Sequence, residues 1–358
     1  MRRCARWCSL WLTALLLAAC TTTPAIPTPG PSPCPAAFAA RPTLPATATP
    51  RATPPPTATP LPTATPAPLP VEHVLLISVD GLTPAALEEV EVPSIARLRS
   101  AGVFAWHAQT VLPSVTLPAH AAMLTGLPPE ITGIDWNSWS EGEPYIGFPT
   151  VLALAHEQGL RVAAVLGKAK LQALFPPGSV DAVEVAWGDR AVAERSARRI
   201  EELRPALLFV HLSGVDAAGH TYGWMSEEYL EAVREADQAI GVLLEALEKA
   251  GIAARTAVLL VSDHGGHGRV HGSSLPEDTT IVWMLSGPGI ARGKEIPGVW
   301  IYDTAPTVLY LLGLPVPDNW QGRVIREAFG EEPGCLLKLP LGDLSPEALP
   351  HRPWTQGE

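Results

Sequence analysis

Side chains that can bind metal ions follow the apolar segments of this 358-residue chain. Three carboxylates and three imidazoles stand at these positions, and they are Asp80, Asp216, His220, Asp263, His264 and His271. Clustering such groups costs free energy unless a cation binds them, because like charges repel and burial disfavours each charge. Mixed Asp and His sets suit Zn²⁺ or Mn²⁺ better than Mg²⁺ or Ca²⁺, which prefer oxygen ligands alone. The residue types therefore predict a transition-metal site.

The spacing of these residues indicates how they are presented. Asp216 and His220 are four residues apart in a stretch that contains Gly219, which we expect to be a loop that lets both side chains reach one ion. Thr116 stands just before Pro118, and proline is a favoured first residue of a helix. A hydroxyl there would meet the positive end of the helix dipole, where phosphate also binds well. Two ions about 4 Å apart would stabilise the entering and leaving oxygens of a phosphoryl displacement.

Five short apolar segments must position these side chains, at residues 74–79, 161–166, 206–210, 257–261 and 281–285. Helical patterns lie between them, at residues 84–100 (with a break expected near Pro93), 149–158, 190–204, 227–250 and 304–312. Near-continuous apolar strands are typical of buried parallel strands. The alternation predicts an α/β fold, with a doubly wound, mostly parallel central sheet and helices on both faces. Ligands bind at the carboxyl ends of such strands, so we expect the Asp, His and Thr side chains to converge there.

Taken in order, these motifs resemble those of the alkaline phosphatase superfamily. The matching segments are Asp80-Gly81, Val115-Thr116-Leu117-Pro118-Ala119-His120, Asp216…Gly219-His220, Asp263-His264-Gly265 and His271-Gly272. They are most similar to its type I phosphodiesterase/nucleotide pyrophosphatase branch, over roughly residues 71–330. The resemblance implies two Zn²⁺ ions, with Mn²⁺ or Fe²⁺ as alternatives. By match, one ion would be held by Asp80, Thr116, Asp263 and His264, and the other by Asp216, His220 and His271.

The resemblance also implies hydrolysis of a small phosphodiester or nucleotide pyrophosphate by double displacement. Thr116 would attack phosphorus and form a phospho-threonine, which hydroxide then cleaves. Asn137 lies in the family-like segment Gly133-Ile134-Asp135-Trp136-Asn137 and would donate to a phosphoryl oxygen, together with main-chain amides near Thr116. Thr132 departs from the His that the family often has at this position.

Several alternatives share this fold, namely a phosphomonoesterase, a phosphonoacetate-type hydrolase and a sulfatase. Sulfatases need a Cys or Ser followed within a few residues by Pro and Arg, whereas this chain has Thr116 and no such Arg. A non-catalytic surface lipoprotein that uses its loops for binding is the alternative of another class. The third ligand of the second ion is assigned to His271 in preference to His267.

The other polar and aromatic residues of these loops receive structural interpretations. His211 follows an apolar strand and is interpreted as a buried core histidine, and His120 as a core or supporting residue on a helix. Lys168 is interpreted as a solvated lysine in preference to a phosphate ligand. Loop packing is the expected use of the neighbouring tryptophans, although they could stack on a nucleobase, and they are Trp136, Trp139 and Trp224.

The N-terminal segment carries the signals of export. Residues 1–20 begin with Met1-Arg2-Arg3, continue through an apolar run at 10–19 that is too short to span a bilayer, and end at Cys20. The sequence Leu17-Ala18-Ala19-Cys20 resembles a bacterial lipoprotein signal. It implies a lipid on Cys20 that anchors the protein to the bacterial cell membrane, outside the cytoplasm.

Composition separates the rest of the chain. Residues 21–70 contain 17 Pro and 12 Thr and are predicted to be a disordered linker. Residues 71–330 are predicted to form the catalytic domain, and residues 331–358 a C-terminal tail. Residues 1–70 hold five Arg and no acidic residue, so the remainder has 20 basic and 36 acidic side chains. A body with a formal charge near −16 repels polyanions, so long nucleic acid is not an expected partner. Oligomeric state is not readable from the sequence.

Overall fold

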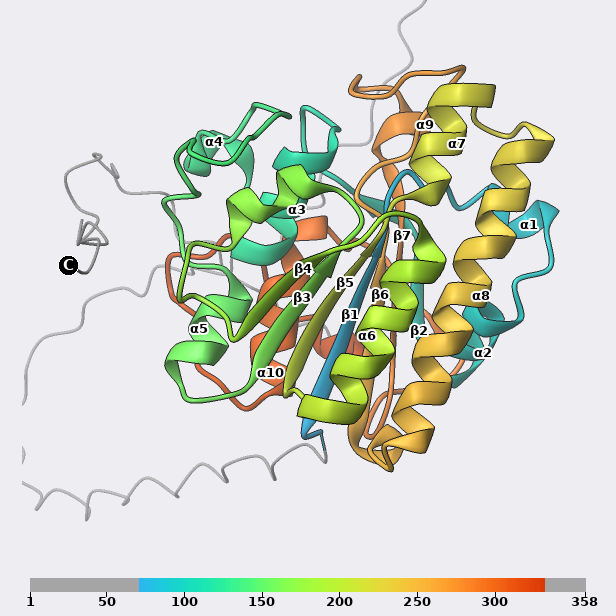
Figure 1. Ribbon diagram of the computed structural model, residues 1–358. Helices are drawn as coiled ribbons and strands as arrows, with labels where there is room; N and C mark the ends of the chain where they lie inside the picture. The colour runs from blue at the N-terminus through green and yellow to red at the C-terminus, as the bar shows by residue number, and fades with distance from the viewer. Residues whose placement is uncertain (1–70, 332–358) are drawn as a thin grey trace, which may run out of the picture. The chain divides into compact units, whose positions relative to one another are not determined.

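The computed structural model describes residues 71–331, so the predicted signal peptide, Cys20, the linker and almost all of the predicted tail lie outside the described residues. One eight-stranded sheet forms in the order β4-β3-β5-β1-β6-β7-β2-β8 (Figure 1). Its strands are β1 (His73–Val79), β2 (Gly102–Gln109), β3 (Val162–Leu166), β4 (Ala182–Val185), β5 (Leu207–Leu212), β6 (Thr256–Val261), β7 (Thr280–Ser286) and β8 (Lys294–Glu295). The neighbours from β4 to β6 are all parallel, which confirms the predicted mostly parallel sheet.

Strand β7 runs antiparallel to β6 and to β2, so its inclusion among the parallel strands was wrong. The chain leaves β6 at its carboxyl end and stays there, because residues 262–279 contain only the four-residue helix α9 (Pro276–Thr279). A parallel neighbour would need a crossover that carries the chain back along the sheet. This loop contains Asp263, His264 and His271, so the antiparallel return keeps all three at the edge where the site forms.

Helices cover both faces of the sheet, as predicted (Figure 1). The α-helices are α1 (Ala86–Glu89), α2 (Pro93–Ala101), α3 (Thr116–Thr125), α4 (Pro129–Thr132), α5 (Val151–Glu157), α6 (Asp189–Leu203), α7 (Gly214–Tyr222), α8 (Glu227–Lys249) and α10 (Thr304–Leu311), besides α9. Short 3₁₀ segments are η1 (Ala169–Leu174), η2 (Ala253–Arg255), η3 (Ile301–Asp303) and η4 (Arg326–Phe329). The helix expected over 84–100 divides as anticipated, since Pro93 begins α2.

The central strand β1 shows why two helical layers are needed. Successive side chains point to opposite faces, so Leu76 packs with α3, α5 and α10 while Leu75 and Ile77 pack with α2, α6 and α8. All three side chains are almost completely inaccessible to water. Burying each leucine or isoleucine side chain stabilises the fold by about 1.5–3 kcal/mol. The sheet is therefore fixed from both sides, and the ends of its strands are held in register.

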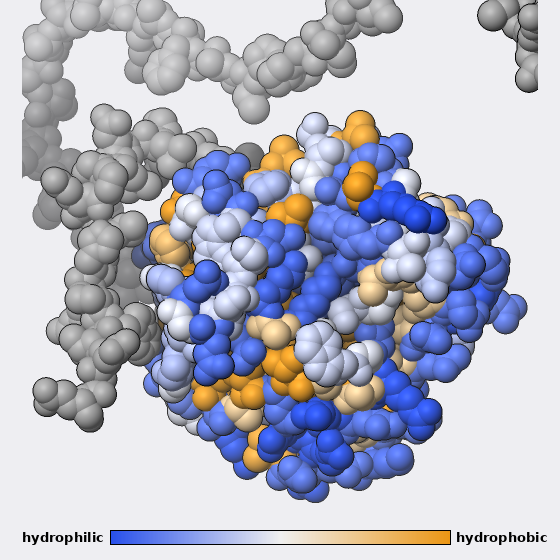
Figure 2. Space-filling model, turned by 45° about the horizontal axis from the view of Figure 1, so that its top comes forward, coloured by the Kyte–Doolittle hydropathy of each residue, from blue (hydrophilic) through white to orange (hydrophobic). Residues whose placement is uncertain are grey.

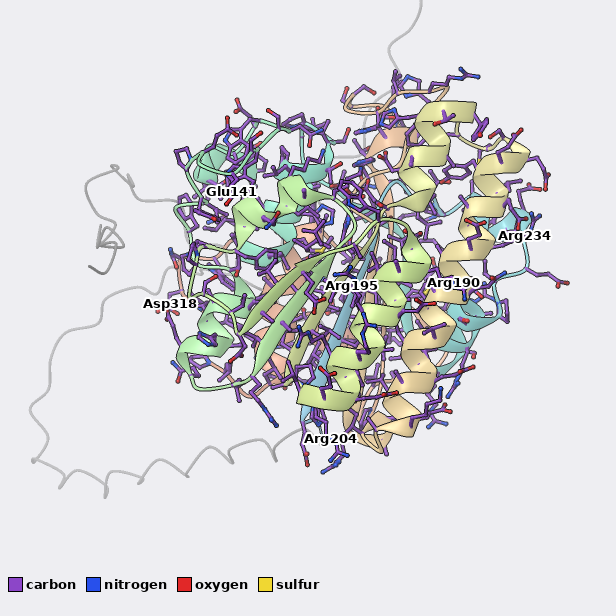
Figure 3. The ribbon with its side chains drawn as sticks, in the orientation of Figure 1. Glu141, Arg190, Arg195, Arg204, Arg234 and Asp318 are labelled. Carbon is purple, nitrogen blue, oxygen red and sulfur yellow. The ribbon has the colours of Figure 1, made fainter. Side chains whose placement is uncertain are left out.

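The face of the molecule seen in Figure 2 is mainly polar. Figure 3 shows charged side chains of the outer helices turned away from the sheet, including Arg190 on α6 and Arg234 on α8. Figure 2 shows mostly hydrophilic side chains, with small separate hydrophobic patches. Within residues 71–331, no helix combines the length and apolar character needed to cross a membrane.

Candidate active site and metal centre

The predicted site residues meet at the carboxyl ends of the parallel strands. Asp80 directly follows β1, Asp263 and His264 follow β6, and α7, which carries Asp216, follows β5. The structure sorts the six acidic and imidazole residues into two groups of three. One group is Asp80, Asp263 and His264, and the other is Asp216, His220 and His271.

The first group is completely buried. Nε2 of His264 lies 3.3 Å from Oδ1 of Asp80 and 3.4 Å from Oδ2 of Asp263. The other oxygen of Asp263 accepts hydrogen bonds from the main-chain N–H groups of Gly81 and His264. The backbone thus fixes one edge of this carboxylate and leaves the other edge facing Asp80 and His264.

The two buried carboxylates and the imidazole of this group shift one another's pKa values. Burial and the charge of Asp80 raise the pKa of Asp263. Burial opposes ionisation of Asp80 too, but the charge of Lys168, the hydrogen bond from His211 and the nearby imidazole of His264 hold its pKa well below the usual value. Burial also disfavours the charged form of His264, yet the carboxylates of Asp263 and Asp80 raise its pKa to about 9. Positive charge beside the Asp80 carboxylate is therefore favoured.

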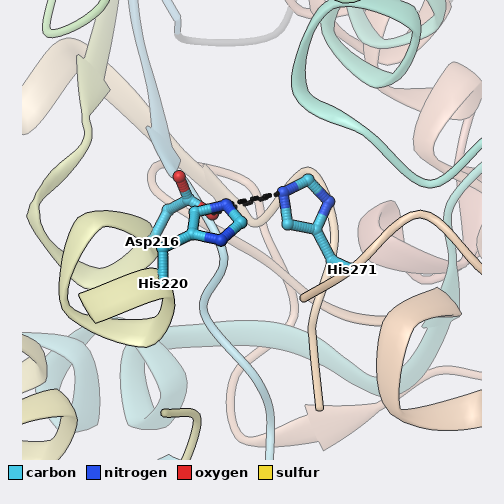
Figure 4. Close-up of side chains that lie close together, drawn as sticks. All are labelled: Asp216, His220 and His271. Atoms are coloured by element: carbon cyan, nitrogen blue, oxygen red, sulfur yellow. Dashed lines mark hydrogen bonds and ion pairs between the residues drawn. The ribbon is translucent and has the colours of Figure 1, made fainter. Parts of the chain in front are cut away.

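The second group is more open to solvent, and Figure 4 shows its three side chains. Nε2 of His220 lies 3.1 Å from Nε2 of His271 and 3.4 Å from Oδ1 of Asp216. Nε2 of His271 lies 3.6 Å from the same Oδ1 of Asp216. Asp216 is buried, whereas 46% of the His220 side chain is exposed. Burial and the neighbouring His264 lower the pKa of His271 to about 4, so its imidazole is neutral at physiological pH. The rings of His264 and His271 stack at 3.7 Å, which places the two groups side by side.

All three histidines present the same nitrogen. Each donates its Nδ1–H to a main-chain carbonyl, His220 to Arg269, His264 to Gly265 and His271 to Ser114. This bond fixes the orientation of each ring and turns its Nε2 atom toward the carboxylates.

The donor atoms fit divalent cations. Six buried side-chain polar atoms among residues 71–331 have no hydrogen-bond partner, and four of them belong to the two groups, namely Asp80 Oδ1, Asp216 Oδ1, Asp263 Oδ2 and His264 Nε2. Such atoms are costly unless something binds them. Ligands about 2.0–2.1 Å from a tetrahedral zinc ion lie about 3.3 Å from one another. The observed separations of 3.1–3.6 Å match that figure closely.

Asp216 and His220 lie on helix α7, so the expected loop was wrong. A spacing of four residues also brings two side chains together on a helix. The helix begins where Asp189, at the start of α6, accepts hydrogen bonds from the N–H groups of Ser213 and Gly214. A carboxylate from another helix therefore supplies the cap that the local sequence does not.

Thr116 is the first residue of α3 and is almost completely buried. The helix thus begins two residues earlier than the proline-based expectation. Main-chain donors near Thr116 are scarce, because Leu117 N–H already donates to Asn137, Pro118 has no N–H and Ala119 N–H donates to Val115. Within the described range, the N–H of Thr116 itself has no acceptor.

Asn137 lies against the start of α3. Its Oδ1 accepts hydrogen bonds from the N–H of Leu117, at 3.0 Å, and from Nζ of Lys170, at 2.8 Å. These bonds orient the amide and leave its NH₂ group without an acceptor in residues 71–331. Asn137 therefore keeps a donor beside Thr116.

Lys168 is not a solvated lysine, and that interpretation was wrong. Its Nζ lies 2.6 Å from Oδ2 of Asp80, 2.6 Å from Oδ2 of Asp216 and 3.4 Å from Oγ1 of Thr116. Only 22% of its side chain is exposed. The flanking apolar strand and Gly167 gave no sign of this contact, because the partners come from β1, α7 and α3.

His211 and His120 are buried, as expected, but both also support the site. Nε2–H of His211 donates to Oδ2 of Asp80, while its Nδ1 accepts from the N–H of Gly167. His120 donates from Nδ1 to the carbonyl of Thr116 and accepts from Ser78 through Nε2. Sequence reasoning missed the role of His211. Its place near the carboxyl end of an apolar strand, where ligands bind in such sheets, could have suggested it.

The remaining residues have structural contacts. His267 pairs with Asp278 at 2.7 Å and lies outside both groups, whereas His271 lies in the second. Trp224 is buried and donates to the carbonyl of Gly81, and Trp136 and Trp139 pack against the core. Packing of the loops by these tryptophans is therefore confirmed.

Glycines allow these close approaches. Gly81 has φ +73°, and a Cβ there would lie 3.0 Å from the Cα of Asp216. A Cβ on Gly265 would lie 2.0 Å from the carbonyl oxygen of Glu277. The loops that carry Asp80 and His264 can approach their neighbours only because both positions lack a side chain.

Comparison with known proteins agrees with this geometry. The family model for type I phosphodiesterase / nucleotide pyrophosphatase matches residues 74–269. Ectonucleotide pyrophosphatase/phosphodiesterase family member 1 of Homo sapiens is 26% identical over 223 residues, which cover 53% of this chain and 23% of that protein. Venom phosphodiesterase CdcPDE of Crotalus durissus collilineatus is 26% identical over 260 residues, 63% of this chain and 30% of that protein. The chain spans about a quarter of the length of the curated relatives it matches first.

Solved structures share the fold. A 2-O GAG sulfatase superposes with a TM-score of 0.61 at 17% identity, covering 73% of this chain and 75% of that one. An inactive murine ectonucleotide pyrophosphatase/phosphodiesterase 5 in complex with AMP gives 0.58 at 16% identity, covering 70% and 97%. These likenesses confirm the predicted alkaline phosphatase-like architecture. The family match over more than half of the sequence carries the assignment, and the chain belongs to the type I phosphodiesterase/nucleotide pyrophosphatase family.

Proposed function

We propose that this protein is a metal-dependent hydrolase of small phosphoric esters, of the phosphodiester or nucleotide pyrophosphate type, with Thr116 as its nucleophile. One observation carries the proposal: two groups of carboxylates and imidazoles, four of whose buried atoms lack a hydrogen-bond partner, adjoin at the strand ends beside a buried threonine at the start of α3. Named relatives that share about half of this chain are phosphodiesterases and nucleotide pyrophosphatases, which favours phosphorus as the centre attacked.

We assign a divalent cation, Zn²⁺ by its ligand types, to each group. Asp80, Asp263 and His264 would hold one with Thr116, and Asp216, His220 and His271 would hold the other. The ions would supply Lewis acidity to the attacking and leaving oxygens.

The chain's own residues would then position and stabilise the reaction. Oγ of Thr116 attacks phosphorus, the bond to the leaving oxygen breaks, and a phospho-threonine is left for hydrolysis by water. The NH₂ group of Asn137 and the N–H of Thr116, which have no acceptor among the described residues, would donate to the non-bridging oxygens. His120 holds the carbonyl of Thr116 and so keeps the helix start in place.

A sulfatase is disfavoured at the nucleophile although sulfatases share the fold. The position holds Thr116, followed by Leu117-Pro118-Ala119-His120, and lacks the Cys or Ser with the nearby Arg. A threonine cannot be oxidised to the aldehyde on which that chemistry depends.

The test is an assay of the full chain with p-nitrophenyl phosphate, bis(p-nitrophenyl) phosphate, p-nitrophenyl phenylphosphonate and p-nitrophenyl sulfate, with and without chelator. We expect cleavage at phosphorus that chelator abolishes, and a fall of about 10³-fold or more in Thr116→Ala. Thr116→Ser keeps a hydroxyl and is the matched control, with metal content measured for both variants. Greater turnover of sulfate would favour the sulfatase, and no turnover by fully loaded protein would favour a non-catalytic binding protein.

We further propose that the protein works outside the cytoplasm, anchored by a lipid on Cys20. The support is the apolar run and the small residues before Cys20 in the sequence. Labelling cells with a radioactive or alkyne fatty acid should mark the wild type and not Cys20→Ala. Equal labelling of both proteins would contradict the anchor.

A further inference from the structure

Two lysines approach Thr116 from a segment that the proposed chemistry does not use. Lys168 and Lys170 stand at the start of η1, directly after β3. Lys168 contacts one carboxylate of each metal-binding group and lies 3.4 Å from Oγ1 of Thr116. Lys170 contacts Asn137 at 2.8 Å. The two ammonium groups therefore reach both the nucleophile and the amide that faces it.

Lys168 does not use the atoms assigned to the ions. It contacts Oδ2 of Asp80 and Oδ2 of Asp216, whereas the Oδ1 atoms of both residues face the imidazoles and have no hydrogen-bond partner. One edge of each carboxylate thus serves the lysine, and the other edge remains for a cation. The ammonium group belongs to the site in addition to the ions.

Lys170 is a cation without an anionic partner. Among residues 71–331 it forms no ion pair, and its hydrogen-bond partner is the neutral amide of Asn137. Burial, followed by the nearby charge of Lys168, lowers its pKa. An anion from outside would relieve this repulsion and satisfy the ammonium.

The segment that carries both lysines is held in place. The N–H of Gly167 donates to Nδ1 of His211, and Oγ of Ser213 donates to the carbonyl of Gly167. A Cβ at Gly167 would lie 2.7 Å from Oγ of Ser213, so the backbone packs closely there. The lysines are therefore presented from a fixed position.

We propose that Lys168 and Lys170 form an anion subsite that selects phosphoryl substrates carrying more negative charge than the single charge of a simple diester. This inference rests on the proposed function and deepens it. The additional charge is a second ionised oxygen on the transferred phosphoryl group, or a phosphate in the leaving group. Either source offers oxygen acceptors to two ammonium donors, which act as point charges and need no particular planar geometry.

The test compares substrates that differ in charge on the metal-loaded full chain. The probes are p-nitrophenyl phosphate, bis(p-nitrophenyl) phosphate and a nucleoside 5′-triphosphate. Lys170→Met should lower kcat/KM for p-nitrophenyl phosphate or the triphosphate by about 10–100-fold, which is the scale of a lost charge-assisted hydrogen bond. The decrease for bis(p-nitrophenyl) phosphate, which carries a single charge, should be several-fold smaller. Lys249→Met, at the exposed end of α8, is the matched control and should change neither value.

The two sources of charge give different patterns. Loss with p-nitrophenyl phosphate assigns the subsite to the transferred phosphoryl group, and loss confined to the triphosphate assigns it to the leaving group. Equal loss for all three substrates would overturn the proposal. Lys168→Met should show the same selectivity, with zinc content and circular dichroism confirming that the site and fold persist.

Binding of inorganic phosphate, measured by calorimetry on the zinc-loaded protein, separates this inference from the proposed function. Weaker binding by about tenfold in Lys170→Met supports the subsite even if no substrate is turned over. Unchanged phosphate affinity in both lysine variants, together with unchanged selectivity, would contradict it.

Discussion

Nε2–H of His211 donates to Oδ2 of Asp80 over 3.0 Å, between the neighbouring strands β5 and β1. The N–H of Gly167 donates to Nδ1 of the same ring, so the imidazole is held as the Nε2–H tautomer. Both side chains are completely buried. His211 therefore fixes the orientation of a proposed metal ligand without contacting the substrate.

We expect His211→Leu to weaken zinc binding at the first group by about 10–100-fold, since supporting hydrogen bonds of this kind have that effect. His211→Gln, whose amide can still donate to Asp80, should recover much of the affinity. Titration against a competing chelator measures the constants directly. Equal affinity in the leucine variant and the wild type would show that the contact is only structural.

Metal removal should destabilise the protein, because it leaves four buried polar atoms without a partner. These atoms belong to Asp80, Asp216, Asp263 and His264. An ion present at 100 times its Kd adds about 2.7 kcal/mol to the free energy of unfolding. For a domain of this size that corresponds to a rise in Tm of about 5–10 °C. Thermal unfolding with zinc and with excess chelator tests this, and Asp263→Asn should respond less to zinc. Identical Tm values would contradict metal binding by the folded state.

Asp189 should make stability depend on pH. Burial raises its pKa from 3.8 to about 6. Hydrogen bonds from the N–H groups of Ser213 and Gly214 oppose this rise only in part, because both reach Oδ1 and Oδ2 receives none. The folded state then binds more protons than the unfolded state between these values, so this residue's contribution to stability falls as the pH rises from about 4 to about 6.

Asp189→Asn removes this titration and keeps an oxygen that can accept both hydrogen bonds. The difference in unfolding free energy, variant minus wild type, should increase by about 2.4 kcal/mol between pH 4 and pH 7.5, from the stated shift in pKa. Urea unfolding at both pH values measures it, and the comparison cancels any constant cost of the amide. A difference that does not change with pH would contradict the raised pKa.

Asp237 should support the fold without affecting chemistry. From the middle of α8, its two oxygens accept hydrogen bonds from the N–H groups of Ser94 and Ile95 in the first turn of α2. Asp237→Ala should lower the free energy of unfolding by about 1–3 kcal/mol, because it leaves buried donors unpaired. Asp237→Asn retains one acceptor and should lose less. Denaturant unfolding measures both, and kcat/KM of the folded variants should equal that of the wild type.

Sequence periodicity was sufficient for much of the architecture. The apolar segments ending at Val79, Leu166 and Val261 are buried strands of one sheet, and helices lie between them on both faces. Strand β2 was not predicted, because its segment Gly102–Gln109 includes polar and partly exposed residues and lacks the continuous apolar pattern of the central strands. Its pairing with β7 provides the stabilisation that its own sequence does not indicate.

By itself, the sequence determined the residue types and their placement directly after strands, and these follow from local patterns of hydrophobicity and turn formation. Tertiary structure decided which side chains meet. It put Asp216 and His220 on a helix, placed His271 and not His267 in the second group, and brought Lys168 to two carboxylates. These contacts join elements that are distant in the chain, so they depend on how crossovers pack against the sheet, and no local pattern encodes that packing.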